Sequence, residues 1–320
     1  MVNSNRIVIG IRDSKLSNAQ TQEFITLAEQ NIDGINANTF QIKHIKTTGD
    51  INNTERLDKI GGKGLFVKEI ESHILNGEID IGVHSMKDMP ATNHQDLDVF
   101  CFMGRLDNSD VLISNNGKTL ENLKSGSVIG TSSIRRRSQI LNFRSDLNIK
   151  LLRGNVDTRL NKLKNKEYDA IILAYAGLKR LGMENEITEI LDQKIFLPAG
   201  GQGVVGIQSK IKTHFRDMFS KINNIQSEIS IIAERSFLKT IKANCNSPVS
   251  VCAKIDNQNV NIQSQIFSHS GELIFNESII GETNDSKNVG SQLGEMAINQ
   301  LGQDVINQLD IFEDDFNYAP

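Results

Sequence analysis

The sequence predicts an α/β protein with two lobes, each built on a mixed and mostly parallel sheet, followed by a smaller C-terminal α+β domain. Short apolar runs alternate with helical patterns through the first two thirds of the chain, which is the rhythm of βαβ units. This rhythm occurs as two successive series. After residue 225 it changes to one helix, three strands and a last helix, a pattern typical of an α+β domain.

Both series place strands and helices in alternation. The first has predicted strands at 6–11, 39–45 and 80–86 and helices near 16–30 and 65–75. The second has predicted strands at 110–114, 127–131, 149–152 and 169–174 and helices at 134–143 and 158–164. A short echo, NGEIDIGV at 76–83 against NKEYDAII at 165–172, leads from a helix end into a strand in each series. Two similar lobes would explain this echo.

The C-terminal domain is predicted from a change of pattern. An amphipathic helix near 227–241 precedes strands near 250–255, 260–267 and 272–280. In the last helix one face is apolar, formed by Val289, Leu293, Met296, Ala297, Leu301 and Val305.

Composition limits the class of protein. The chain has 320 residues, of which 38% are hydrophobic and 23% charged, and a formal net charge of -4, a balance typical of soluble globular proteins. The first thirty residues lack the basic start and long apolar run of a secretory signal. No stretch approaches the roughly 20 apolar residues of a membrane span. We therefore expect a cytoplasmic protein without membrane contacts.

Cysteine and histidine patterns give no sign of a disulfide framework or a metal site. Cys101, Cys245 and Cys252 form an odd set without metal-like spacing, so one of them is a candidate reactive thiol. The six histidines are scattered and form no paired-ligand motif. We expect no bound metal.

Residues 131–165 reverse the charge of the chain, with nine Lys and Arg against two acids. The Thr-Ser-Ser segment 131–133 supplies helix caps, and the helix that follows begins with the arginines 135–137. Cations in a first turn oppose the helix dipole by about 0.3 to 1 kcal/mol each. An anion bound there would reverse that cost, and guanidinium forks suit a polyanionic small molecule. Arg153 and Arg159 could return to the same cleft.

Two alternatives remain open for this basic segment. A solvated basic helix face would need no ligand, because exposed charges contribute little. Nucleic acid is another anion, but only Phe143 offers an aromatic platform in the segment and the sequence pI is about 5.9. A single aromatic residue and an acidic pI are not the features expected of a nucleic-acid-binding protein.

Two glycine-rich segments are not nucleotide motifs. IGGKGLF, at 60–66, fails as a phosphate loop because Lys63 is followed by glycine. It suits either a mobile basic lid with Lys59 and Lys63 or a plain surface loop. GGQGVVG, at 200–206, contains G-x-G-x-x-G but leads into a predicted strand where a dinucleotide site needs a helix. We interpret it as a backbone crossing between lobes.

Two further residues are candidates for chemistry. Asp88 in VHSMKDMP follows a predicted strand, where an acid is either a cap or ion-pair partner, or a group that stabilises a cation or accepts a proton. Cys245 in KANCNSPV lies in a turn-like segment after a helix. A lone cysteine is more often inert and buried, but the composition of this turn favours the access that a nucleophilic thiol needs.

As an ordered set, these motifs resemble the porphobilinogen deaminase family, also called hydroxymethylbilane synthases. The matching segments run from Arg12 to beyond Cys245: GGKGLFVKE, VHSMKDMP, GTSSIRRRSQ, LRGNVDTRL, YDAIILAYAGLKRLG, LPAGGQGVVGI and the loop with Cys245. The resemblance implies three domains, of which the first two are shaped like the lobes of a periplasmic binding protein with the active site in the cleft between them. Their expected bounds are 1–103 with 198–222, then 104–197, then 223–320.

The resemblance also implies an activity and a cofactor. Four porphobilinogen molecules are condensed head to tail, with loss of ammonia, onto a dipyrromethane attached through a thioether to Cys245. Hydrolysis then frees linear hydroxymethylbilane. Each pyrrole carries an acetate and a propionate, so the growing chain is a polycarboxylate that needs several arginines. The family further suggests a monomer.

Residue roles follow from the same resemblance, with Asp88 as the catalytic residue that stabilises the charge developing when ammonia leaves. The implied cofactor-binding residues are Cys245, Ser85, Lys87, Asp88, Thr131, Ser132, Ser133, Arg135, Arg136 and Arg159. The implied substrate-binding residues are Arg12, Ser14, Gln20, Arg153, Arg159 and Arg180. Lys59, Lys63 and Phe66 belong to the implied lid loop. Departures from the family pattern are Lys15, Ala243, Asn244 and the additional Arg137, to which we assign no role.

Two competing functions come from other classes. A two-lobed carboxylate-binding protein without catalysis would share the lobes and arginines, but it leaves Cys245 and the third domain unexplained and would normally need an export signal. An RNA-binding protein would require salt-sensitive binding through 131–165.

Overall fold

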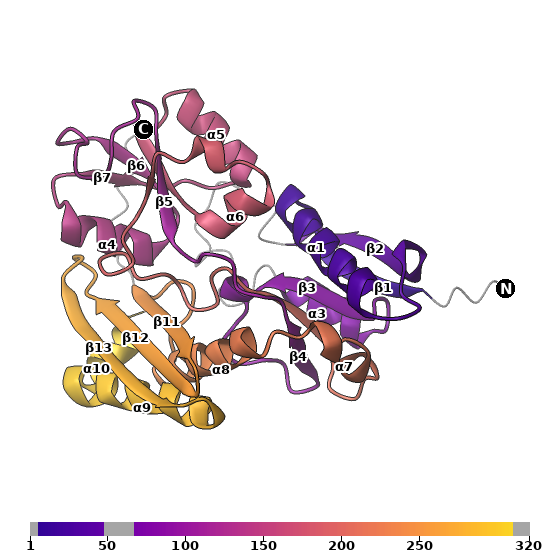
Figure 1. The fold of residues 1–320 in the computed structure, drawn as a ribbon. Helices are drawn as coiled ribbons and strands as arrows, with labels where there is room; N and C mark the ends of the chain where they lie inside the picture. Colours follow the sequence, from indigo (N-terminus) through magenta and orange to yellow (C-terminus); the bar gives the residue numbers. More distant parts are fainter. Residues whose placement is uncertain (1–5, 48–66, 310–320) are drawn as a thin grey trace. The chain divides into compact units, whose positions relative to one another are not determined.

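The computed structural model describes residues 6–47 and 67–309, and the predicted α/β class is confirmed (Figure 1). The chain divides into two compact units. The first contains Met1–Leu106 and Val204–Glu228, and the second contains Asp107–Gly203 and Ile229–Pro320. The predicted separation of the second unit into a lobe and a C-terminal domain stays a prediction.

The first unit is built on a five-stranded sheet in the order β2-β1-β3-β10-β4. Its strands are β1 (Ile7–Arg12), β2 (Phe40–Ile45), β3 (Ile81–Ser85), β4 (Leu97–Phe102) and β10 (Val205–Lys210). The first three strands pair in parallel, whereas β10 runs antiparallel to both of its neighbours. Helices α1 (Lys15–Asn31) and α3 (Lys68–Leu75) bury apolar faces in two separate cores on this sheet.

The second unit begins with a sheet of the same plan, in the order β7-β6-β8-β5-β9. Its strands are β5 (Asp110–Ser114), β6 (Val128–Gly130), β7 (Asn148–Lys150), β8 (Ala170–Ala174) and β9 (Glu189–Ile190). Here β6 pairs in parallel with β7 and β8, and β5 runs antiparallel to β8. The helices of this part are α4 (Ile134–Phe143), α5 (Val156–Lys164) and α6 (Tyr175–Arg180).

The similar segments 76–83 and 165–172 make the same pair of hydrogen bonds to a neighbouring strand, once in each sheet. Asp80 precedes β3, and its backbone N–H donates to the Val8 carbonyl while its carboxylate accepts the Val8 N–H at 2.7 Å. Asp169 precedes β8 and makes the same pair of bonds with Val128, again with 2.7 Å for the carboxylate contact. Each aspartate therefore sets the start of the central parallel pair in its sheet.

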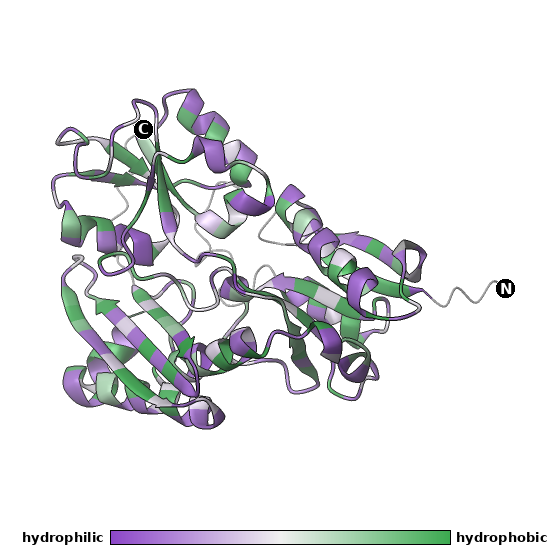
Figure 2. Cartoon of the chain, viewed as in Figure 1, coloured by the Kyte–Doolittle hydropathy of each residue, from purple (hydrophilic) through white to green (hydrophobic). Residues whose placement is uncertain are grey.

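The C-terminal part of the second unit is a three-stranded antiparallel meander covered by helices. Strands β11 (Val249–Asp256), β12 (Asn259–Phe267) and β13 (Leu273–Glu282) lie in sequence order. Hydrophobic and polar residues alternate along β12 (Figure 2), so one face packs into a core with α8 (Ile225–Thr240) and α9 (Ser286–Leu301).

The prediction of one continuous last helix was wrong. α9 ends before Gly302, whose φ of 85° lies in the left-handed region, and a short helix α10 (Gln303–Gln308) follows. Met296 and Val305, assigned to the apolar face, are 39% and 40% exposed. The spacing of Val305 fits a helical period, but the glycine reorients the chain before it, as glycine at a helix end commonly does.

Across residues 6–47 and 67–309, every helix is too short or too polar to cross a lipid bilayer.

His84 is a buried histidine at the centre of the first sheet. It is 5% exposed on β3, and a Cβ added at Gly82 would lie 2.7 Å from its Nε2 atom, so the glycine leaves room for the imidazole. Burial lowers the pKa of His84 to about 4, because the charged form loses hydration. The folded protein therefore holds this ring neutral.

We predict that His84 makes the protein less stable in mild acid. Because its pKa is lower when folded than when unfolded, its contribution is complete above pH 6.5 and is lost as pH falls towards 4. Between pH 7.5 and pH 5 the loss is about 2 kcal/mol in the free energy of unfolding. Urea unfolding at both pH values measures it. In His84→Asn this part of the pH dependence should disappear, and an unchanged dependence would contradict the prediction.

Candidate active site

The first group of candidate residues lies where β1 and β3 end. These strands are parallel neighbours, so their carboxyl ends meet at one edge of the sheet. Arg12 is the last residue of β1, and its Nη1 atom lies 3.9 Å from the Asp88 Oδ2 atom in the 3-10 turn after β3. Gln20 of α1 donates from Nε2 to the Ser85 Oγ atom at 2.8 Å. A carboxylate, a guanidinium and two neutral polar groups therefore share this edge.

Two more predicted residues lie in this region. Ser14 is the N-cap of α1, since its Oγ atom accepts the Ser17 N–H at 3.1 Å. Lys87 is half-buried in the same turn as Asp88. Lys15, one of the departures from the family pattern, is the first residue of α1, and the helix starts there normally because Ser14 supplies the cap.

The second group surrounds the start of α4. As the sequence predicts, β6 is followed by a polar turn and then by the helix that carries the arginines. Ser133 is the N-cap, with its Oγ atom accepting the Arg136 N–H at 3.4 Å. Thr131 is buried and accepts the Ser133 N–H at 3.2 Å through Oγ1. These bonds direct the first turn of α4 into the interior.

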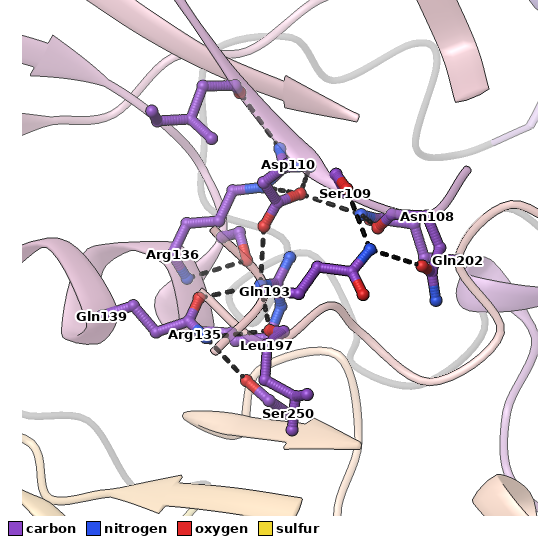
Figure 3. A network of polar contacts seen from close by, with 12 residues as sticks. Asn108, Ser109, Asp110, Arg135, Arg136, Gln139, Gln193, Leu197, Gln202 and Ser250 are labelled. Carbon is purple, nitrogen blue, oxygen red and sulfur yellow. Dashed lines mark hydrogen bonds and ion pairs between the residues drawn. The ribbon is translucent and has the colours of Figure 1, made fainter. Parts of the chain in front are cut away.

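Arg135 and Arg136 both meet the carboxylate of Asp110, the first residue of β5 (Figure 3). Arg136 donates to Oδ1 from Nη2 at 2.7 Å and from Nε at 3.1 Å. Gln202 donates to the same oxygen from Nε2 at 2.9 Å. Arg135 Nη1 lies 2.7 Å from Oδ2, but its two N–H groups point to Gln139 and to the Leu197 carbonyl. Its contact with Asp110 is therefore mainly electrostatic.

This cluster has an unbalanced charge in a dry environment. Asp110, Arg135 and Arg136 are 0%, 4% and 7% exposed, so two cations share one anion and one positive charge is left over. Burial alone would raise the pKa of Asp110, but the two guanidiniums hold it well below its usual range. Burial lowers the pKa of Arg135, and Asp110 opposes that shift. The Asp110 carboxylate is thus kept ionised, and the two guanidiniums leave an excess positive charge that attracts a further anion.

The internal carboxylate was not anticipated from the sequence. The sequence predicts that the cations in the first turn of α4 bind an external anion, whereas Asp110 already neutralises part of their charge. The signal available in the sequence was that Asp110 is an acidic residue at the start of an apolar strand. Gln139 was also missed, although it stands four residues after Arg135 on one helix face. Gln202 lies in the glycine-rich segment, between two glycines whose pattern gives no sign of a polar role for it.

The other three predicted arginines occupy separate positions in the second unit. Arg153 follows β7 and is 7% exposed, and burial lowers its pKa. Arg159 of α5 donates from Nε to the Gly154 carbonyl at 2.8 Å. Arg180, at the end of α6, donates from both Nη atoms to the Gly203 carbonyl at 3.3 Å. Arg180 is thereby joined to the loop whose Gln202 reaches Asp110.

The glycine-rich segment is a turn followed by a strand, as predicted. Gly201 and Gly203 have φ values of 78° and 89°, which side chains other than glycine rarely adopt. β10 follows at Val205, and the chain passes from the second unit to the first after Gly203. The Gly201 N–H donates to a carboxylate oxygen of Glu234 at 2.7 Å, so this turn is also fixed to α8.

Cys245 is exposed in the loop between α8 and β11, whereas Cys101 and Cys252 are buried. Burial raises the pKa of Cys101 to about 12, and the Cys252 sulfur accepts the Asn108 Nδ2 amide at 3.3 Å. Access and deprotonation are what a thiol needs to form a covalent bond. Of the three cysteines, Cys245 alone has the access.

Lys59, Lys63 and Phe66, predicted for the lid loop, lie outside the described residues.

Comparison with known proteins identifies relatives along almost the whole chain. Residues 7–215 match the family model described as "Porphobilinogen deaminase, dipyromethane cofactor binding domain", and residues 229–299 match "Porphobilinogen deaminase, C-terminal domain". Porphobilinogen deaminase of Geobacillus sp. is 42% identical over 95% of this chain and 97% of its own length. The Bacillus mycoides protein of the same name is 41% identical over 94% and 97%. Among solved structures, the periplasmic VFT2 domain of Bordetella pertussis BvgS is 11% identical, covers 69% of this chain and 88% of its own, and has a TM-score of 0.41.

We predict that Asp110→Asn strongly destabilises the second unit. Removing the carboxylate that contacts both buried guanidiniums leaves them without this counter-ion, and breaking such a buried pair costs about 3 to 5 kcal/mol. Urea unfolding of the variant and the unchanged chain measures the difference. Asp146→Asn is the matched control, because the Asp146 pair with Arg144 lies near the surface and its loss should change the midpoint little. Equal effects of the two substitutions would contradict the prediction.

Proposed function

The chain belongs to the porphobilinogen deaminase family, and we propose that it condenses four porphobilinogen molecules head to tail, with loss of ammonia, into linear hydroxymethylbilane. It is accordingly a transferase of tetrapyrrole synthesis. The observation that supports this activity most directly is the buried cluster of Arg135 and Arg136 on Asp110, which retains one positive charge. A polycarboxylate is the ligand class that such a cluster attracts.

The residues present fit a dipyrromethane cofactor. Cys245 supplies an exposed thiol for a thioether, and the acidic side chains of two pyrroles would match the excess positive charge of the second unit's arginines. Thr131, Ser132 and Ser133 add hydroxyl and N–H groups at the start of α4. When bound, the dipyrromethane supplies the terminal pyrrole carbon to which the first substrate is joined. Arg159, Ser85 and Lys87 complete the proposed cofactor contacts.

We propose substrate-binding roles for residues of each unit, taken separately. In the first, Arg12 would pair with a substrate carboxylate, and Ser14 and Gln20 would add hydrogen bonds. In the second, Arg153, Arg159 and Arg180 supply further guanidiniums. Arg159 and Arg180 donate to the carbonyls of Gly154 and Gly203, which orients their guanidinium groups, and guanidinium groups can bind carboxylates through paired hydrogen bonds.

Asp88 has the catalytic role in this proposal. As ammonia leaves porphobilinogen, positive charge develops on the pyrrole ring, and a fixed carboxylate lowers the energy of that state. Asp88 is 33% exposed in its side chain and lies 3.9 Å from Arg12, so it is reachable and does not form a tight ion pair there. Its carboxylate can therefore hold pyrrole N–H groups and the developing charge.

A carboxylate-binding protein without catalysis is not favoured. The chain shares 42% identity with an enzyme over nearly its whole length. It also carries an exposed cysteine that simple binding would not require. We further propose a cytoplasmic monomer that binds neither membrane nor nucleic acid.

We predict that the active protein carries a covalent adduct of dipyrromethane mass on Cys245. Intact-mass measurement of freshly prepared protein should show the adduct, and Cys245→Ala should abolish it together with turnover. Cys252→Ala is the control, since that thiol is buried and its loss should leave the adduct in place. A bare chain with full activity would overturn the proposed attachment.

We predict that Asp88→Asn folds and retains its adduct but loses about 10²- to 10³-fold in kcat, the usual effect of removing one group that stabilises transition-state charge. Thermal unfolding and intact mass establish the fold and the adduct, and formation of hydroxymethylbilane measures the rate. Asp98→Asn serves as the control, because Asp98 pairs with Arg216 at the surface. Turnover of Asp88→Asn close to that of the control would exclude the proposed role.

A further inference from the structure

Gln139 occupies a junction between α4 and the C-terminal strands of the same unit (Figure 3). It is 1% exposed. Its Oε1 atom accepts Arg135 Nη1 at 2.8 Å, and its Nε2 atom donates to the Leu197 carbonyl at 2.8 Å and to Ser250 Oγ at 3.0 Å. One side chain therefore contacts the guanidinium, the segment before the glycine-rich turn, and β11.

These partners fix the orientation of the Gln139 amide. Arg135 offers only donors, and the Leu197 carbonyl is only an acceptor. If the amide were rotated by half a turn, its NH₂ group would face the guanidinium and its oxygen would face the carbonyl, so both contacts would become repulsive. The Leu197 carbonyl is also shared, because it accepts from Arg135 Nη1 at 3.0 Å. The arrangement of Arg135 and Gln139 is thus determined by charge and by hydrogen-bond direction.

The same junction is close in sequence to the cysteine loop. Ser250 stands on β11, five residues after Cys245. The loop between them is braced by its own turn, in which the Asn244 N–H donates to Ser247 Oγ at 2.9 Å and the Asn246 N–H donates to Asn244 Oδ1 at 2.8 Å. The Phe267 N–H then donates to the Pro248 carbonyl at 3.0 Å. These bonds limit the conformations of the chain between Cys245 and Ser250.

We infer that Gln139 is a positioning residue for cofactor assembly, and this inference rests on the proposed function. Through Ser250 on one side and Arg135 on the other, it sets the distance between the thiol that tethers the dipyrromethane and the guanidinium that binds its carboxylate. If the Cys245 thiol and the Arg135 guanidinium are held at a separation that matches the cofactor, less entropy is lost when the cofactor binds to both. Gln139 does not itself touch the cofactor.

Arg137 provides a matched comparison. It lies on the same helix and donates from Nη1 to the His269 carbonyl at 3.1 Å, in the turn between β12 and β13. It therefore also joins α4 to the C-terminal strands, but through the turn after β12 rather than through Gln139 and β11. A substitution there weakens the same junction, and the proposed function gives Arg137 no role.

The experiment follows the gain of dipyrromethane mass by the full-length chain, produced without access to porphobilinogen and then mixed with it. We predict that Gln139→Met, which keeps the length and apolar packing but removes the amide, gains the adduct about 10- to 100-fold more slowly. Arg137→Met should gain it within about twofold of the unchanged chain. In the loaded fraction of Gln139→Met, kcat for hydroxymethylbilane should fall while KM for porphobilinogen stays within about twofold, since the proposed substrate contacts are untouched.

Several outcomes would overturn the inference. Equal rates of adduct gain in Gln139→Met and the unchanged chain would remove the positioning role, and equal slowing in Arg137→Met would show that only the stability of the junction matters. Thermal unfolding of each variant separates loss of fold from slow assembly. If Gln139→Met does not fold, Ser250→Ala decides, because it removes one acceptor of the amide and should also slow the gain. Failure of the unchanged chain to gain any adduct would instead overturn the proposed function.

Discussion

The second unit depends on the burial of two guanidiniums against one carboxylate. Asp110 opens β5, Arg135 and Arg136 open α4, and all three are almost fully removed from water. A buried charge is tolerated only when it is paired and hydrogen-bonded, so the polar turn before α4 and the amide of Gln202 must hold these groups in place. The remaining positive charge makes the same cluster suitable for an acidic ligand. Stability and proposed function therefore rest on one interaction.

Local features were predictable from the sequence because they depend on neighbouring residues. The helix predicted at 134–143 has those bounds in the structure, since apolar periodicity and a serine cap act over a few residues. The partner of the arginines could not be found in this way. Asp110 and Arg136 are 26 positions apart, and only the antiparallel return of β5 beside β8 brings Asp110 to the helix. The prediction of the last helix was wrong for a local reason, because a single glycine, Gly302, interrupts a regular apolar pattern.

Some residues of the candidate site can be identified from their local sequence, and others cannot. Asp88 and Cys245 were singled out by their position after a strand or in a turn, and the structure gives one a nearby guanidinium and the other exposure. Residues such as Gln139 have no distinctive neighbourhood in the sequence, since a glutamine on a helix is usually a surface residue. Its importance comes from Leu197 and Ser250, two partners that are distant along the chain and that reach it only when the elements are packed.

The repeated aspartate at the start of β3 and β8 shows what the two sheets share and what they do not. Asp80 and Asp169 bind the neighbouring strand in the same manner, so both sheets present the carboxyl ends of parallel strands in equivalent ways. The charged groups near those ends differ in their balance. In the first unit the Asp88 carboxylate lies near the Arg12 guanidinium, whereas after β6 the second unit places two guanidiniums on the single carboxylate of Asp110. A carboxylate suits a developing cation and an excess of guanidinium charge suits an acidic ligand, so two sheets built on one plan carry different groups for the proposed reaction.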